Sequence, residues 1–221
     1  MIAGLGSGVS LFARSIPLFA RSIPLFSRDH KVIAFDNRGA GRTDKPDSPY
    51  TIEMMADDAD GLLRALDIKR ADVLGVSMGG RIAMDLAIRY PDMVRGLILV
   101  STSARVNNET RSSFGLRFGK LTKMITGSGA FGGSPQPYHA FIHQLEASAK
   151  FDCTDRLGGI SAPTLIMRGD RDTLAPEDLV EEVHSGIKGS RLVEFKGGHI
   201  FFLWENKKFT EAVSEFLTGL G

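Results

Sequence analysis

The sequence predicts an α/β fold in which a mostly parallel sheet is flanked by helices. Two observations indicate it: short runs that are apolar throughout recur along the chain, and amphipathic stretches with helical spacing separate them. Strands that are apolar on both faces are typical of parallel sheets covered by helices on both sides. The 221 residues fit one domain of this class, and a hydrophobic content of 43% suffices for a sizeable core.

Five apolar runs are predicted to form the strands of the sheet, and they cover residues 31–35, 71–76, 94–102, 163–169 and 191–197. Apolar residues at a spacing of three or four predict helices between and after these strands. Thr51 is expected to cap the first of these helices. Pro91 is expected to end the second, because proline cannot continue a helix. Further helices are predicted at 138–150, near 176–187 and around 209–217.

Residues 105–161 interrupt the alternation of strands and helices. This stretch is longer than an ordinary loop and richer in glycine, serine and aromatic residues than the strands on either side. We therefore predict that it forms a short inserted helical lid, or cap, and that residues 1–104 and 162–221 form the core. Its aromatic residues either line an apolar pocket for a bound molecule or pack the lid onto the core; they are Phe114, Phe118, Phe131, Tyr138 and Phe141.

Charge and cysteine content exclude several classes of function. A formal net charge of +1 gives no electrostatic reason to expect nucleic acid or an acidic surface as a partner. Cys153 is the only cysteine, so the chain forms no intrachain disulfide and no thiolate metal cluster. No uncharged apolar stretch is long enough to span a membrane, and no basic segment followed by an apolar core marks a secretory signal. We expect a cytoplasmic protein.

The stretch GVSMG, residues 75–79, places a serine between glycines where a predicted strand meets a predicted helix. This is the pattern G-x-S-x-G, and the strand–turn–helix context gives the pattern its meaning. The sharp turn lifts the Ser77 hydroxyl out of the fold, and the residues two positions away must be small because a Cβ there would collide with the turn. The same turn aims the Met78 N–H at a developing oxyanion. We predict that Ser77 is a nucleophile.

A serine nucleophile needs a base to remove its proton and an acid to orient that base. Among the five histidines, His199 follows a glycine loop at the carboxyl end of a strand, where an α/β sheet places its chemistry. We expect the others to be solvated or packing residues: His30, His139, His143 and His184. For the acid, Asp170 and Asp172 both follow the strand at 163–169, whereas no carboxylate follows the strand at 94–102. The chain order Ser, Asp, His is that of nucleophile-elbow hydrolases.

With these residues, the sequence resembles the α/β-hydrolase fold superfamily, and in particular the 3-oxoadipate enol-lactonases and related small esterases. The segments that carry the likeness are FDNRGAGRTDKP, GVSMGGRIAMDLAIRYPDMVRGLILVST, HQLEASAKFDCTDRLGGISAPTLIMRGDRDTLAP and GGHIFFLWENKKFTEAVSEFL. In this family the acid stands three residues after a glycine and four before a proline, and Gly169, Asp172 and Pro176 fit that spacing. The resemblance therefore implies that Asp172, rather than Asp170, is the acid.

The resemblance also implies a second oxyanion donor near the start of the chain. The family usually has a His-Gly pair after an early strand, and the residue that follows the glycine supplies the N–H group. In the segment MIAGLGS, Ala3 stands in place of the histidine and Gly4 keeps the glycine. Leu5 is then the implied donor.

Together these residues predict a serine hydrolase that cleaves a small-molecule carboxylic ester or lactone without a metal or cofactor. Ser77 attacks the carbonyl, His199 relays the proton and Asp172 orients the imidazole, and water then releases the acyl group. A C–C bond hydrolase or a perhydrolase would use the same residues. A hydrolase-like ligand-binding or signalling module would keep them with slow or no turnover. Haloalkane dehalogenases and epoxide hydrolases are disfavoured, because they place an aspartate where Ser77 stands.

The segment LFARSIP occurs twice in direct succession, at residues 11–17 and 18–24. One copy followed by LFSRDH suffices for the helix that the family needs before the strand at 31–35, so the second copy is surplus. The strands that usually come before this point in the family are absent, which predicts an uncovered sheet edge. We therefore expect a less stable protein that self-associates, as a dimer or a larger oligomer, with activity below that of its relatives.

Overall fold

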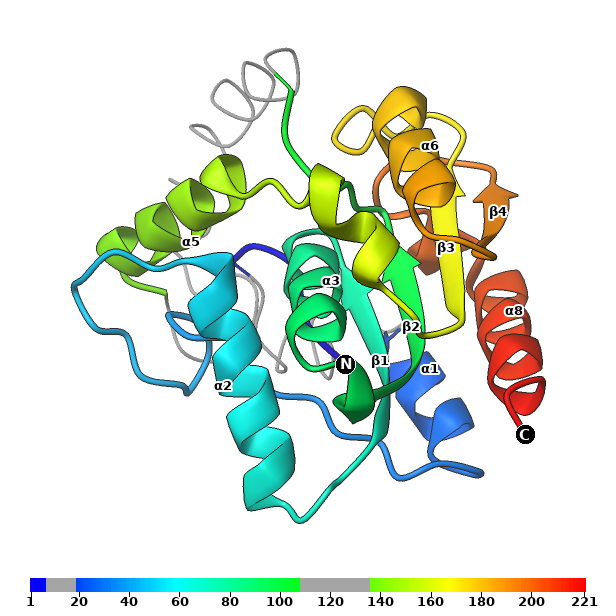
Figure 1. Cartoon of the computed structure of the whole chain (residues 1–221), viewed down its shortest axis with the longest axis horizontal. Helices are drawn as coiled ribbons and strands as arrows, with labels where there is room; N and C mark the ends of the chain where they lie inside the picture. The colour runs from blue at the N-terminus through cyan, green and yellow to red at the C-terminus, as the bar shows by residue number, and fades with distance from the viewer. Residues whose placement is uncertain (7–18, 108–135) are drawn as a thin grey trace.

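The computed structural model describes residues 1–6, 19–107 and 136–221, and it confirms the predicted α/β class (Figure 1). Four parallel strands form one sheet in the order β1-β2-β3-β4. They are β1 (Ala71–Val76), β2 (Val94–Val100), β3 (Thr164–Gly169) and β4 (Arg191–Phe195). Four of the five predicted apolar runs therefore form strands close to the expected bounds.

Helices connect and flank these strands. They are α1 (Phe19–Phe26), α2 (Ile52–Ala65), α3 (Met78–Arg89), α5 (Tyr138–Lys150), α6 (Glu177–Gly186), α7 (Phe201–Trp204) and α8 (Asn206–Thr218), with 3₁₀ turns at Pro91–Met93 and Thr154–Gly159. Thr51 caps α2 as predicted, because its side chain accepts a hydrogen bond from the Met54 N–H. In the part of the chain that the structure describes, no helix is long and apolar enough to cross a membrane.

Alternate residues of each strand point to opposite faces of the sheet, and in β1, β2 and β3 both faces are largely buried. On one face, Val73 and Leu97 belong to a buried cluster with residues of α2, α3 and α6. On the other face, Leu74 and Ile98 belong to a second cluster with residues of α1, α7 and α8. Helices therefore cover the sheet on both sides (Figure 1), which explains why the strands are apolar at successive positions.

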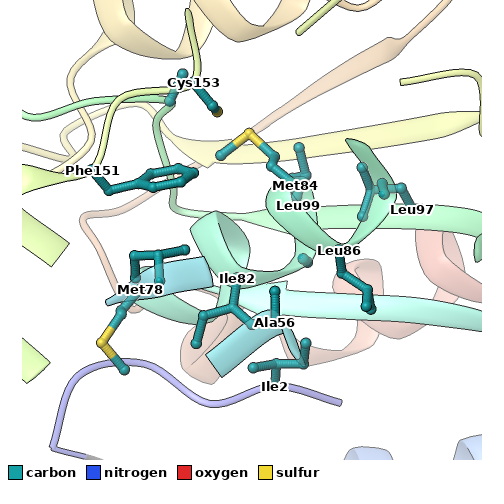
Figure 2. Packing of buried hydrophobic residues seen from close by; sticks show 14 of the residues in the cluster. Ile2, Ala56, Met78, Ile82, Met84, Leu86, Leu97, Leu99, Phe151 and Cys153 are labelled. Atoms are coloured by element: carbon teal, nitrogen blue, oxygen red, sulfur yellow. The ribbon is translucent and has the colours of Figure 1, made fainter. Parts of the chain in front are cut away.

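The described part of the insertion at 105–161 packs onto the core. Phe151 and Cys153, which follow α5, belong to the same buried cluster as α3, and Figure 2 shows them beside Met84. Burial raises the pKa of the Cys153 thiol to about 12, so the thiol stays protonated at neutral pH. Residues 108–135 lie outside the described part of the chain, and a lid formed by the whole insertion stays a prediction.

The prediction of a strand at residues 31–35 is wrong. In this segment only Phe35 forms a bridge, to Ile2, and Ile2 in turn bridges Gly75 of β1. Residue 2 therefore lies between the two segments and extends the sheet by a single position. A strand needs several successive hydrogen-bonded partners. Residues 31–35 face the segment that holds Ile2, and that segment turns at residues 5–6, so it offers too few partners.

Helix α1 is formed by FARSIP of the second copy and the LF that follows it. The side chain of Ser22 contacts α8, because its Oγ accepts a hydrogen bond from Asn206 Nδ2 at 2.6 Å. Phe26 is buried against the sheet. One copy thus supplies the helix that the sequence predicted. Residues 7–18, which hold the whole first copy and Leu18 of the second, lie outside the described residues.

Deletion of residues 18–24 is expected to preserve or raise the midpoint of thermal unfolding and the turnover rate. The two copies are identical, so the shortened chain still joins one copy to LFSRDH and forms α1 from the same residues. Thermal unfolding followed by circular dichroism, with light scattering on both proteins, measures the effect. A markedly lower midpoint in the variant, with a monomeric wild type, would make the duplicated segment an integral part of the fold. Self-association stays a prediction that the same light scattering tests.

Candidate active site

Ser77 occupies the turn between β1 and α3, and its backbone is strained. Its φ is 55° and its ψ is −119°, in a region that residues other than glycine seldom adopt. A Cβ on Gly75 would collide with the backbone of Gly79. A Cβ on Gly79 would collide with the carbonyl oxygens of Ile2 and Ala3. The steric reason for small residues on both sides of the serine is therefore confirmed.

Hydrogen bonds to the end of β2 hold this turn in place. The Ser77 N–H donates to the Val100 carbonyl at 2.9 Å. The Ser77 carbonyl accepts from the Thr102 hydroxyl at 2.7 Å and from the Gly80 N–H at 2.9 Å. Because the strained backbone is fixed from both sides, the Ser77 hydroxyl is presented in one direction at the carboxyl end of the sheet.

The loop after β4 brings His199 to this hydroxyl. His199 Nε2 lies 3.0 Å from Ser77 Oγ, and His199 Nδ1 lies 2.9 Å from Asp172 Oδ2. An ionised carboxylate only accepts hydrogen bonds, so Nδ1 carries the ring proton and Nε2 is left to accept the Ser77 hydroxyl proton. The structure thus brings together three side chains that the sequence singled out, from three different strand ends.

The Asp172 side chain is buried behind the imidazole. Burial alone raises the pKa of its carboxyl, but hydrogen bonds from His199 and from the Ala175 and Leu174 amides outweigh burial and hold the pKa below its ordinary value of 3.8. The two amides donate to Asp172 Oδ1 at 3.1 and 2.9 Å. The carboxylate is therefore charged at neutral pH and fixed in position, as an acid that orients a histidine must be.

Asp170, the alternative acid, makes different contacts. It accepts a hydrogen bond from the Gly197 N–H at 2.8 Å and one from Lys196 Nζ at 3.1 Å. These bonds, the Gly197 bond foremost, lower the pKa of its carboxyl. The hydrogen bonds of Asp170 thus go to the loop that carries His199 and not to the imidazole ring, which is bonded to Asp172 instead.

Of the predicted oxyanion donors, Met78 follows Ser77 in the chain and Leu5 follows Gly4, which lies beside Ser77. Met78 is the first residue of α3, and the first amides of a helix have no acceptor within it. Leu5 follows Gly4, and a Cβ on Gly4 would lie 3.4 Å from Ser77 Cβ and 3.9 Å from Ser77 Oγ. The loop that carries Leu5 therefore runs directly beside the predicted nucleophile. Donation by the two amides to an oxyanion stays a prediction.

The aromatic residues predicted to line an acyl pocket are described only in part. Those outside the described residues are Phe114, Phe118 and Phe131. Tyr138 is 63% exposed and lies at the surface of α5. Phe141 is fully buried, and its ring would lie 3.2 Å from a Cβ on Gly6. Phe141 therefore packs against the loop that carries Leu5, and substrate contact by either residue stays a prediction.

The other four histidines make contacts elsewhere. His139 and His143 of α5 bond to residues 45–47, His184 bonds within its own segment, and His30 is exposed. Within the described ranges, no three His, Cys, Asp or Glu side chains are grouped so as to hold a metal ion.

Two buried side-chain amides that were not predicted from the sequence hold the loop of Leu5. Asn37 Nδ2 donates to the Ala3 carbonyl at 2.9 Å, and Gln144 Oε1 accepts from the Gly6 N–H at 3.1 Å. Asn37 lies in FDNRGAGRTDKP, a segment that carries the family resemblance, but nothing in the sequence marks its contact with Ala3. Gln144 is one polar residue on an amphipathic helix, and its spacing does not distinguish it from a surface residue.

Comparisons with known proteins identify the family to which the chain is similar. The family model of the alpha/beta hydrolase fold matches residues 1–131. The AB hydrolase superfamily protein YisY of Bacillus subtilis is 31% identical, over 84% of this chain and 81% of its own. A pimeloyl-[acyl-carrier protein] methyl ester esterase of Neisseria meningitidis is 30% identical, over 85% of this chain and 83% of its own.

The solved structure of an enol-lactonase from Burkholderia xenovorans is also similar. It shares 26% sequence identity and a TM-score of 0.81, and the match covers 98% of this chain and 89% of the lactonase chain. The family model matches more than half of the present chain. The chain belongs to the alpha/beta hydrolase fold family.

Proposed function

We propose that the protein is a serine hydrolase that cleaves a carboxylic ester or lactone through an acyl-enzyme. The observation that carries this proposal is the unbroken hydrogen-bond relay from Ser77 Oγ through the His199 ring to Asp172, with distances of 3.0 and 2.9 Å. Similarity to an esterase and to an enol-lactonase supports this substrate class. Acyl transfer of this kind needs a nucleophile, a base and oxyanion donors, all of which side chains and backbone supply.

In the first step, Ser77 Oγ forms a bond to the carbonyl carbon while its proton passes to His199 Nε2. The carbonyl oxygen gains negative charge, and the N–H groups of Met78 and Leu5 stabilise it. The Asp172 carboxylate stabilises the imidazolium that forms. The bond between the carbonyl carbon and the leaving oxygen then breaks, and that oxygen takes the proton from Nε2. In a lactone the leaving oxygen stays attached to the acyl chain.

In the second step, water releases the acyl group. His199 Nε2 removes a proton from the water as its oxygen bonds to the carbonyl carbon, and the same oxyanion donors stabilise the second tetrahedral intermediate. When this intermediate collapses, the bond to Ser77 Oγ breaks and the oxygen recovers its proton from Nε2. The free acid leaves and the enzyme returns to its starting state. We place this reaction in the cytoplasm, a location with which the one free cysteine is compatible.

The purified protein is expected to hydrolyse at least one substrate of a panel of aryl esters and lactones with saturation kinetics. The panel holds p-nitrophenyl acetate and butyrate, followed by absorbance, and γ- and δ-lactones, followed by titration of the released acid. Two further substrates test other bonds: a carbamate tests cleavage at a carbonyl bonded to nitrogen, and a 1,3-diketone tests cleavage of a C–C bond. Turnover of only these two would replace the proposed substrate class. No turnover at all, together with a ligand-dependent rise in the unfolding midpoint, would favour a binding module instead.

A further inference from the structure

The loop from Ala3 to Gly6 leaves the sheet at Ile2 and is fastened at both ends. At its start, the Ile2 N–H donates to the Leu74 carbonyl at 2.8 Å, and the Ala3 carbonyl accepts from Asn37 Nδ2 at 2.9 Å. At its end, the Gly6 N–H donates to Gln144 Oε1 at 3.1 Å. The amide of residue 5 lies between these two fixed points. Its direction is therefore set by the position of both ends.

The side chain of Gln144 forms hydrogen bonds to three segments that are separate in the sequence. Its side chain is completely buried on α5. Oε1 accepts from the Gly6 N–H and from Gln136 Nε2, the latter at 3.0 Å, and Nε2 donates to the Arg38 carbonyl at 2.6 Å. A primary amide offers both an acceptor and a donor, so one side chain joins the loop, the segment before α5 and the segment after Phe35.

The neighbours of the loop leave little room for another position. Gly6 has a φ of +68°, and a Cβ there would press on the ring of Phe141. On the opposite side, Gly79 of α3 lies so close to the loop that a Cβ would strike the Ile2 and Ala3 carbonyl oxygens. The loop is thus held between the first turn of α3, which follows the nucleophile, and the buried face of α5.

We propose that Gln144 is a positioning residue for the oxyanion site. It holds the Gly6 N–H and so keeps the preceding Leu5 amide directed at the carbonyl oxygen of a group bound to Ser77. This inference rests on the proposed function. It places the control of one oxyanion donor on α5, within the insertion, and not on the sheet. Gln144 itself is buried behind the loop and acts through it.

Loss of the hydrogen bond between the Gly6 N–H and Gln144 Oε1 is expected to lower kcat more than it changes KM. An oxyanion donor stabilises charge that develops only in the transition state, so a displaced donor costs little in the ground state. Removal of one such donor in other enzymes costs about 10²–10³-fold in kcat. A donor that is loosened but present should cost less, and we expect a fall of about 10- to 100-fold in kcat for Gln144→Met, with KM changed by less than about threefold.

The matched control is Gln136→Met. Gln136 is also buried and belongs to the same network, but it bonds to Gln144 and not to the loop. Both variants lose a buried amide and are expected to unfold at lower temperature. Only the Gln144 variant is expected to lose turnover, and Gln136→Met should keep kcat within about threefold of the wild type. Gln144→Asn, which retains an amide but is too short to reach Gly6, serves as a second variant should Gln144→Met fail to fold.

The decisive readout is inhibition by a trifluoromethyl ketone, whose adduct with the nucleophilic serine places a negatively charged oxygen in the oxyanion site. The inhibition constant of the Gln144 variants is expected to rise by the same factor by which kcat/KM falls. Equal kcat values in the Gln144 and Gln136 variants, or a rise in KM at unchanged kcat, would overturn the role of Gln144 and leave the proposed function standing. A wild-type protein without any acyl-transfer activity would instead overturn the proposed function and this inference with it.

Discussion

Ser77→Ala is expected to lower ester or lactone turnover by at least about 10³-fold without unfolding the protein. The methyl group cannot form an acyl-enzyme, and only binding and the oxyanion donors would remain to promote attack by water. The small side chain fits the turn, since alanine adds nothing that would meet Gly4 or Met78. The measurement is kcat/KM on the best substrate of the panel, with the unfolding midpoint as the check on folding.

Ser101→Ala is the matched control for this variant. Ser101 follows β2 as Ser77 follows β1, it also has a positive φ, of 46°, and it is buried. Among the described residues its hydroxyl has no hydrogen-bond partner, so its removal breaks no contact of the relay. Turnover within about threefold of the wild type is expected for this control. Undiminished activity in Ser77→Ala would remove Ser77 from the mechanism.

Asp172→Asn is expected to lower kcat by about 10³–10⁴-fold, whereas Asp170→Asn should cost less than about tenfold. An asparagine amide at 172 donates to His199 Nδ1, which leaves the ring proton on Nε2 and removes the acceptor for the Ser77 proton. Asparagine at 170 keeps a carbonyl oxygen for the Gly197 N–H, so the loop that carries His199 is still held. Steady-state kinetics of the two variants, purified side by side, give the ranking.

The two aspartates form a matched pair, because both follow β3 and each loses one charge in its variant. A larger loss for Asp170→Asn than for Asp172→Asn would mean that the hydrogen bond from the imidazole to Asp172 does not serve catalysis. Equal and small losses would show that catalysis needs neither carboxylate to orient the histidine. Either result would contradict the mechanism proposed for the relay.

Much of the fold could be predicted because the elements have strong local patterns. Residues 71–76 form β1 at the predicted bounds, and helix α5 spans the predicted 138–150. The errors occur where a partner decides the structure. Strand β2 ends at Val100 and not at residue 102, because Ser101 adopts a positive φ and Thr102 bonds to the Ser77 carbonyl. The spacing of side chains in the sequence does not predict such a contact.

The candidate site was predictable to the extent that its residues have local signals. Ser77 lies between glycines at a strand end, and His199 follows two glycines at another. The residues alone did not separate Asp170 from Asp172, which are neighbours on the same loop; the family spacing favoured Asp172, and the structure bonds Asp172 to the histidine. Gln144 was not predictable, because its contact with Gly6 joins positions 138 residues apart and depends only on how the chain folds.

The central claim is that Ser77 becomes covalently acylated, and the location of a covalent adduct tests it most directly. A fluorophosphonate reacts with a serine whose proton is removed by a base, and the adduct resists hydrolysis long enough for analysis. After incubation, intact-protein mass spectrometry and peptide mapping are expected to show one adduct, on Ser77, that is absent from Ser77→Ala and present in Ser101→Ala. An adduct on another serine, or no adduct in the folded wild-type protein, would contradict the account.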